Sequence, residues 1–168
     1  MEILDLLSTA IVHGLETAIY QQRGDFDLIR TIGRTGPLEV DLWMSMGAGA
    51  LEGRPAAGML HYGVALEGMT PPHFRVARES LDLDPGTPDP AHGPGSRLKT
   101  VLLQRDWTEG GIQDESRCQM ESFVFTPTDL SLTAFRWSVG HPTLNAVADL
   151  LANSRIYPSF HIAPAWMG

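Results

Sequence analysis

The chain has 168 residues, of which 43% are hydrophobic and 19% are charged, and this composition is typical of one globular domain with its own core. Twenty acids against twelve bases give a formal net charge of −8, so the surface repels phosphate backbones and generic nucleic-acid binding is disfavoured. An acidic surface of this kind suits solubility or a basic partner. The single cysteine excludes an internal disulfide framework and indicates a reducing compartment.

The N-terminus carries no sign of export. Residues 1–7 contain acids where a secretory signal would carry Lys or Arg. No apolar run approaches the roughly 18 residues that a membrane-spanning helix needs. We therefore expect a cytoplasmic protein that does not engage a membrane.

The first segment predicts an amphipathic helix over residues 2–22. Its apolar side chains recur at steps of three and four residues. They are Leu4, Leu7, Ile11, Leu15, Ala18 and Ile19. Gly24 is placed to end this helix, and residues 25–35 fit either a helical turn or an edge strand.

Alternation of polar and apolar residues predicts strands through the middle of the chain. Residues 38–46 alternate most clearly, and Trp43 is the large aromatic residue on their polar side. Further strands are expected over residues 57–66, 74–83, 98–107, 117–126 and 129–139. Residues 108–116, which contain Gly110 and Gly111, are expected to be a connection.

Proline and glycine mark the remaining segments. Residues 84–96 hold four prolines and three glycines and predict a long surface loop. Pro142 suits a first helical position, and residues 142–153 carry one apolar stripe of a helix. The C-terminal arm, residues 155–168, is too apolar to be solvated and too rich in proline to be a helix.

The order of these elements predicts a single α+β domain over residues 1–168. Its core is a mainly antiparallel sheet of five or six strands, flanked by an N-terminal and a C-terminal helix. The order resembles that of small chaperone-like and adaptor domains in architecture only, and architecture does not carry function.

The best candidates for metal or acid–base chemistry are His61, Glu67 and His73, which share one strand parity. Their six-residue gaps correspond to roughly 20 Å along a strand, so only a hairpin through residues 68–72 would bring them together. The paired His-x-His of cupin metal sites is missing. We therefore expect no metal and no cofactor.

Other chemical motifs have simpler explanations. The glycine-rich residues 47–53 follow a strand but no helix follows them, so they do not form a dinucleotide loop. Cys118 falls in an expected strand, where an inert buried thiol is the usual case. The remaining histidines are expected at the surface or at helix caps, and they are His13, His92, His141 and His161.

A cluster of acids surrounds Trp107 in the sequence. Its members are Asp106, Glu109, Asp114, Glu115 and Glu121. We expect a solvated hairpin end, and the alternative is an aromatic-containing turn that receives a cationic group.

Three functions remain open, and the first is favoured. The first is a non-catalytic binding or assembly protein (an adaptor, chaperone-like, immunity or structural subunit) that meets a protein partner or a second copy through a sheet face and the C-terminal arm. Its expected contact residues are Trp43, Trp107, Trp137, Tyr157, Phe160 and Trp166. The second is a small enzyme that uses His61 or His73. The third is a small-molecule carrier with a cavity lined by Met44, Met46, Met59 and Met69.

Overall fold

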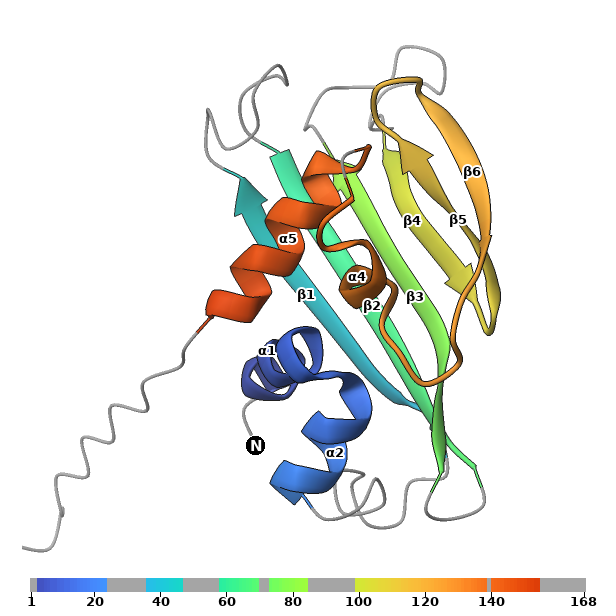
Figure 1. Cartoon of the computed structure of the whole chain (residues 1–168). Coiled ribbons are helices and arrows are strands. Elements are labelled where there is room, and N and C mark those ends of the chain that lie inside the picture. Colours follow the sequence, from blue (N-terminus) through green and yellow to red (C-terminus); the bar gives the residue numbers. More distant parts are fainter. Residues whose placement is uncertain are drawn as a thin grey trace, which may run out of the picture.

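The computed structural model describes residues 3–23, 36–46, 58–69, 73–84, 99–138 and 140–154. They form one six-stranded antiparallel sheet with helices on one of its faces, which confirms the expected α+β class (Figure 1). The strands are β1 (Leu38–Met46), β2 (Gly58–Gly68), β3 (Phe74–Asp84), β4 (Thr100–Asp106), β5 (Glu109–Asp114) and β6 (Gln119–Val124). The helices are α1 (Ile3–His13), α2 (Leu15–Arg23), α4 (Ser131–Phe135) and α5 (Pro142–Asn153).

The sheet is an up-and-down meander in which every strand pairs with its neighbours in the sequence. Strand β1 pairs with β2 over nine consecutive residues without a register shift. One bulge interrupts the β2–β3 pairing and another interrupts the β3–β4 pairing. Bulges bend and twist a strand, so the long strands β2 and β3 can curve around the helices.

The helices cover one face of the sheet and bury a single apolar cluster against it. From α1 this cluster takes Leu6, Leu7, Ala10 and Ile11, and from α5 it takes Leu144, Val147, Ala148 and Leu151. The sheet supplies every second residue, for example Leu60, Tyr62, Val64 and Leu66 of β2. A hydrogen bond of 2.9 Å from Ser8 Oγ to the Ala152 carbonyl joins α1 to α5.

The N-terminal helix predicted over residues 2–22 is two helices. The chain breaks at Gly14, whose φ of 91° lies in a region that only glycine enters without strain. The first turn of α2 then follows at an angle to α1 (Figure 1). The expected cap at Gly24 and residues 25–35 lie outside the described residues.

The expected connection over residues 108–116 is wrong, because residues 109–114 form β5. Glycine weakens a strand, but it also allows neighbouring backbones to approach closely. A Cβ atom on Gly110 would lie 2.8 Å from the Arg105 Cα and would also meet the carbonyl oxygen of Gln104. The two glycines therefore mark a close approach within the sheet.

The strand expected over residues 129–139 is also wrong, since Ser131–Phe135 form the short helix α4. The first backbone amides of this helix bond to the carboxylate of Glu79, which lies on β3, as described below. That contact is made across the fold, so local alternation could not indicate it. The helix expected over residues 142–153 is confirmed, with Pro142 in its first turn.

Two further expectations fall mostly on residues that the structure does not describe. They are the surface loop over residues 84–96, apart from Asp84, and the C-terminal arm over residues 155–168. Among the described helices, none has the length and apolar character to cross a membrane.

Candidate functional site

The face of the sheet that is turned away from the helices, here called the open face, carries three rows of cross-strand neighbours. Its members come from alternate residues of β1 to β4, opposite in parity to the core residues. The rows are Glu39–Ala65–Arg78–Asp106, Asp41–Gly63–Ser80–Gln104 and Trp43–His61–Asp82–Val101. Polar and aromatic groups of four strands thus lie side by side on one surface.

Small residues make the middle of the open face hollow. Two adjoining cavities of about 330 and 190 Å³ share Arg78 and Ser80. Gly63 lies on the floor, where an added Cβ atom would meet Ser80 Oγ at 3.1 Å and Asp41 Oδ1 at 3.3 Å. We call this hollow the open-face groove, and its open-face lining residues are Glu39, Asp41, His61, Gly63, Ala65, Arg78, Ser80, Asp82, Val101, Gln104 and Asp106.

Trp43 and His61 form a stacked pair at the edge of this groove. Their ring centroids are 4.2 Å apart with an interplanar angle of 20°, and Trp43 remains 64% exposed. His61 Nε2 lies 2.8 Å from Asp41 Oδ1, and its Nδ1 lies 3.8 Å from Asp82 Oδ2. Both ring nitrogens of His61 therefore face carboxylates.

The groove has more acids than matching bases. Lys99 Nζ lies 2.6 Å from Asp82, and Arg78 donates to Glu39 at 3.0 Å. In the part of the chain that the structure describes, no Lys or Arg lies within ion-pair distance of Asp41 or Asp106. The groove thus keeps an excess of negative charge.

The structure does not bring His61, Glu67 and His73 together. Glu67 accepts two hydrogen bonds from Arg75, at 3.0 and 2.7 Å, in the register of the β2–β3 hairpin. His73 is exposed just before β3, and its carbonyl accepts the Met69 amide at 2.8 Å. Within the described ranges no group of three His, Cys, Asp or Glu side chains is placed to hold a metal ion.

The acids around Trp107 divide among separate tasks. Glu115 accepts hydrogen bonds from Thr143 N at 2.8 Å and Thr143 Oγ1 at 2.7 Å, so it caps the first turn of α5. Trp107 itself already receives a cation from its own chain, since the Arg75 guanidinium lies 3.7 Å from its ring centroid. In the alternative in which this turn receives a cation, Arg75 of the same chain already occupies one face of Trp107.

Asp114 shapes the turn between β5 and β6. Its Oδ1 accepts hydrogen bonds from Ser116 Oγ at 2.6 Å, from Ser116 N at 2.8 Å and from Arg117 N at 3.1 Å. The Ser116 hydroxyl, followed by the two backbone amides and the Arg117 charge, lowers the pKa of this carboxyl from its ordinary value against the opposing effect of burial. The acid is therefore a structural element of the turn.

One single-residue expectation is wrong. Cys118 is exposed in the β5–β6 turn with a φ of 54°, whereas we expected a buried strand thiol, because the chain reverses just before β6 begins. His141 is the N-cap residue of α5, which is one of the two places expected for it; it is buried, and its Nδ1 lies 3.0 Å from the Gln113 carbonyl. His13 is exposed at the end of α1 as expected, and His92 and His161 lie outside the described residues.

Three of the four methionines proposed to line a cavity have described side chains, and these three lie at separate places. Met59 and Met69 are 38% and 51% exposed, while Met44 packs against the core on the helix side of the sheet. The Met46 side chain lies outside the described part of the chain. The positions of these three side chains give no support to the expected methionine-lined pocket.

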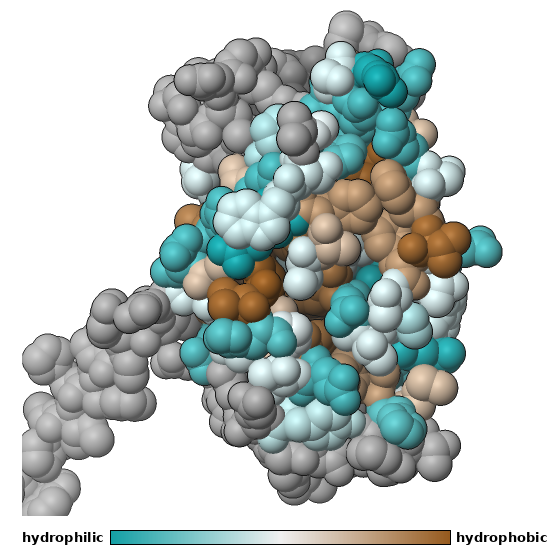
Figure 2. Space-filling model, in the orientation of Figure 1, coloured by the Kyte–Doolittle hydropathy of each residue, from teal (hydrophilic) through white to brown (hydrophobic). Residues whose placement is uncertain are grey.

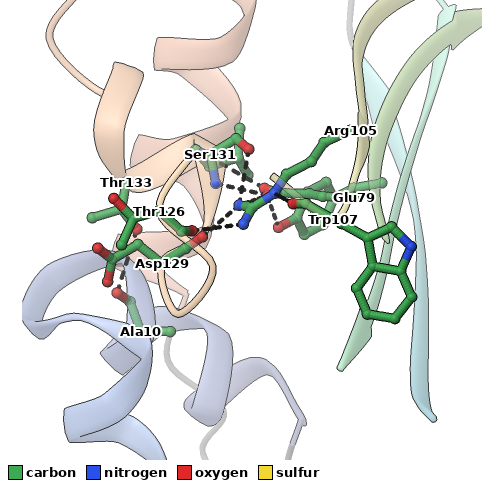
Figure 3. A network of polar contacts seen from close by, with 10 residues as sticks. Ala10, Glu79, Arg105, Trp107, Thr126, Asp129, Ser131 and Thr133 are labelled. Carbon is green, nitrogen blue, oxygen red and sulfur yellow. Dashed lines mark hydrogen bonds and ion pairs between the residues drawn. The ribbon is translucent and has the colours of Figure 1, made fainter. Parts of the chain in front are cut away.

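A buried polar network that the sequence patterns did not predict lies on the helix side, between β3, β4 and α4 (Figure 3). Glu79 and Arg105 are cross-strand neighbours with fully buried side chains, and Arg105 Nη1 lies 3.6 Å from Glu79 Oε2. Glu79 also accepts hydrogen bonds from Tyr62 Oη at 3.0 Å, from Ser131 N at 2.7 Å and from Leu132 N at 3.3 Å.

Arg105 holds the segment that leads into α4. Its three nitrogens donate to the carbonyls of Trp107, Asp129 and Thr126, each at 2.6 Å. Burial lowers the pKa of Arg105, and the negative charge of Glu79 opposes that shift. Burial raises the pKa of Tyr62, and the charge of Glu79 adds to that shift. Because these groups satisfy one another away from solvent, we interpret the network as structural rather than catalytic.

The helix side also has a smaller hollow beside β6. Figure 2 shows apolar surface between the helices and β6 on this side. A cavity of about 260 Å³ is lined there by Phe125, Leu130 and Phe135 among others, and Phe123 packs edge-on against Phe135 at 4.8 Å. Arg105, which also lines this hollow, is engaged by three backbone carbonyls, so its guanidinium is not available to a ligand there.

The expected aromatic contact residues differ in what the structure describes of them. Trp43, Trp107 and Trp137 are 64%, 39% and 78% exposed, respectively. Tyr157, Phe160 and Trp166 lie outside the described residues. Comparison of the chain with protein-family models, with curated proteins and with solved structures found no match.

Proposed function

We propose that the protein is a non-catalytic binding protein that docks another polypeptide on the open face of its sheet. The observation that carries this proposal is the position of Trp43, 64% exposed at the edge of a groove that crosses four strands. Large aromatic side chains that remain exposed are common anchors of protein interfaces. The proposed place of action is the cytoplasm, where an exposed thiol such as that of Cys118 stays reduced.

The distribution of apolar groups supports a broad contact. Met59 is exposed beside Trp43, on the β1–β2 side of the open face. Met120 and Val124 are 48% and 85% exposed on β6, at the opposite edge of the sheet. An interface across the groove would bury apolar groups at both rims, around a polar centre.

A second candidate is a small enzyme that uses His61 for acid–base chemistry. It is favoured by the 2.8 Å contact between His61 Nε2 and Asp41 beside a cavity. It ranks second because the other ring nitrogen also faces a carboxylate, that of Asp82. A metal analysis and an activity screen of the native protein against His61→Ala distinguish the two: a turnover that this change abolishes supports the enzyme.

The binding proposal is tested by site-specific photocrosslinking in the native host. A photoreactive amino acid replaces Trp43 in one variant and Leu150, an exposed residue of α5, in a control. We expect one discrete partner band at position 43 that is absent at position 150. Competition by excess native protein, but not by Trp43→Ala, should remove this band. Equal or absent crosslinking at both positions would contradict the proposal.

The C-terminal arm is proposed as a second contact with the partner or with another copy of the chain. Helix α5 ends at Asn153, so truncation after this residue keeps the described helices and strands. We expect the truncated chain to bind the partner more weakly, or to contain fewer chains per assembly when its mass is measured by light scattering. If partner binding and the number of chains per assembly are both unchanged, the arm is not a contact and the open face alone remains in the proposal.

A further inference from the structure

Building on the proposed function, we infer that the segment docked in the open-face groove is a basic, extended stretch of a partner polypeptide. Its Lys or Arg side chains pair with Asp41 on β1 and with Asp106 on β4. The proposed function needs only a polypeptide on the open face. The inference adds the charge of that polypeptide and the two residues that select it.

The first argument for a basic segment is the charge of the groove. Two of its acids, Glu39 and Asp82, are already matched by Arg78 and Lys99. Asp41 is 61% exposed, and its one partner among the described residues is the imidazole of His61, at 2.8 Å.

Asp106 is an exposed residue that lines the larger cavity, and no Lys or Arg of the described residues pairs with it. These two unmatched carboxylates are the positions at which an incoming cation gains most, because interfaces bring opposite potentials together.

The spacing of the two acids suits an extended segment. Asp41 and Asp106 lie three strands apart and one row apart in the register. At about 4.8 Å between strands, this separation is roughly 15 Å. An extended chain advances about 3.3 Å per residue, so two basic residues four positions apart on one side of the segment span a similar distance.

The floor and rim of the groove fit such a segment. The surface between the two acids carries small side chains, so a backbone can approach the sheet there. These residues are Gly63, Ala65 and Ser80. Trp43 stands beside Asp41 at the rim and offers an exposed aromatic surface to a guanidinium or ammonium group. An acidic segment would meet the same two carboxylates with repulsion, and the net charge of −8 extends this preference over the whole molecule.

The test uses the full-length protein and three synthetic twelve-residue peptides in which Ser alternates with Lys, Gln or Glu. Binding is measured by calorimetry at about 50 mM salt, where exposed charges still interact at long range. Backbone amide shifts in NMR locate the contact. We expect the Lys peptide to bind at least about tenfold more tightly than the Gln peptide, with shifts confined to β1–β4, and the Glu peptide not to bind.

Charge-neutralising variants make the test specific. Asp41→Asn and Asp106→Asn should each weaken the Lys peptide about threefold, as expected for the loss of one exposed charge pair. The matched control, Glu16→Gln on the exposed side of α2, should leave its affinity unchanged. Equal affinity for the three peptides, equal effects of the three variants, or shifts on the helix side would each overturn the inference.

The outcomes separate the inference from the proposed function. If Trp43 crosslinks to a partner but the crosslinked segment is neutral or acidic, the open face remains a binding surface and the inference is wrong. If crosslinking at position 43 also fails, the proposed function itself falls.

Discussion

Glu79 of β3 and Arg105 of β4 face each other across neighbouring strands, and both side chains are completely buried beneath α4. Arg105 is the largest fully buried side chain of the described residues. The pair joins the sheet to the helix layer, because Glu79 binds the first amides of α4 and Arg105 binds the carbonyls that lead into it. Burial of two charges is tolerated only where each finds several partners, as both do in this network.

Replacement of Arg105 by Ala should therefore destabilise the fold severely. It leaves the Glu79 charge without its cation and deprives three backbone carbonyls of a donor. We expect the free energy of unfolding to fall by about 3–5 kcal/mol, measured by urea denaturation. The control is Arg117→Ala, whose side chain is 70% exposed and whose ion pairs are 3.6 and 3.7 Å long. That change should cost less than about 1 kcal/mol, and similar losses for the two variants would contradict the structural role of Arg105.

Gly110→Ala should disrupt the pairing of β4 with β5. The added methyl group would lie 2.8 Å from Arg105 Cα and 3.0 Å from the Phe125 ring, and the backbone cannot withdraw without breaking the ladder. We expect a loss of about 2 kcal/mol or more in unfolding free energy, as for an overpacked core. Gly36→Ala is the control, because no described residue other than its chain neighbour has an atom within 4 Å of the added Cβ. Equal stability of both variants would show that β5 does not approach β4 as described.

Asp114 should make the free energy of unfolding fall as the pH is lowered into the acid range. Its pKa is lowered in the folded state, chiefly by the Ser116 hydroxyl, so its contribution is present above the ordinary aspartate value of about 4. The contribution disappears as the pH falls through the lowered folded-state value. Asp114→Asn should thus be less stable than the native protein at neutral pH, and the difference should shrink below about pH 4. A difference that stays constant from neutral to acid pH in denaturation curves would contradict this assignment.

Gly63→Ala should impair partner binding more than it impairs folding. The new methyl group enters the open-face groove at 3.1 Å from Ser80 Oγ, which a small rotation of that hydroxyl can relieve. We expect a thermal midpoint within a few degrees of the native value and a clear loss of crosslinking at position 43. Intact crosslinking in a folded Gly63→Ala protein would place the contact away from the groove floor.

The sequence was most informative where local patterns decide the structure. The alternation around Trp43 predicted β1 over its full length, and the stripe after Pro142 predicted α5 with its observed bounds. The sequence patterns gave wrong predictions where contacts between residues distant in the chain determine the secondary structure. The Ser131–Phe135 segment alternates like a strand, but its amides find their acceptor on Glu79, 52 residues away from Ser131. Gly110 and Gly111 signal a turn locally, yet they serve close packing between strands.

In the candidate site, too, local patterns predicted single residues, whereas contacts between distant residues could not be predicted. The exposure of Trp43 could be inferred from its parity within β1. The neighbours that make its surroundings a groove could not, because Asp41, His61 and Asp82 come together only through the register of three strands. A signal for the Glu79–Arg105 pair did exist in the sequence, since each is a lone charge at an inward position of its strand. Without the register, nothing indicated that they belong together.

The contact between Ser8 and Ala152 has a consequence for how the chain is made. Each strand of the meander pairs with the strand synthesised just before it, so the sheet can assemble in step with translation. Helix α1 is made first, but its packing partner α5 emerges 144 residues later. Until then the inner surface of the growing sheet lacks part of its cover, which makes the late arrival of α5 the step at which the nascent protein is most open to aggregation or to a chaperone.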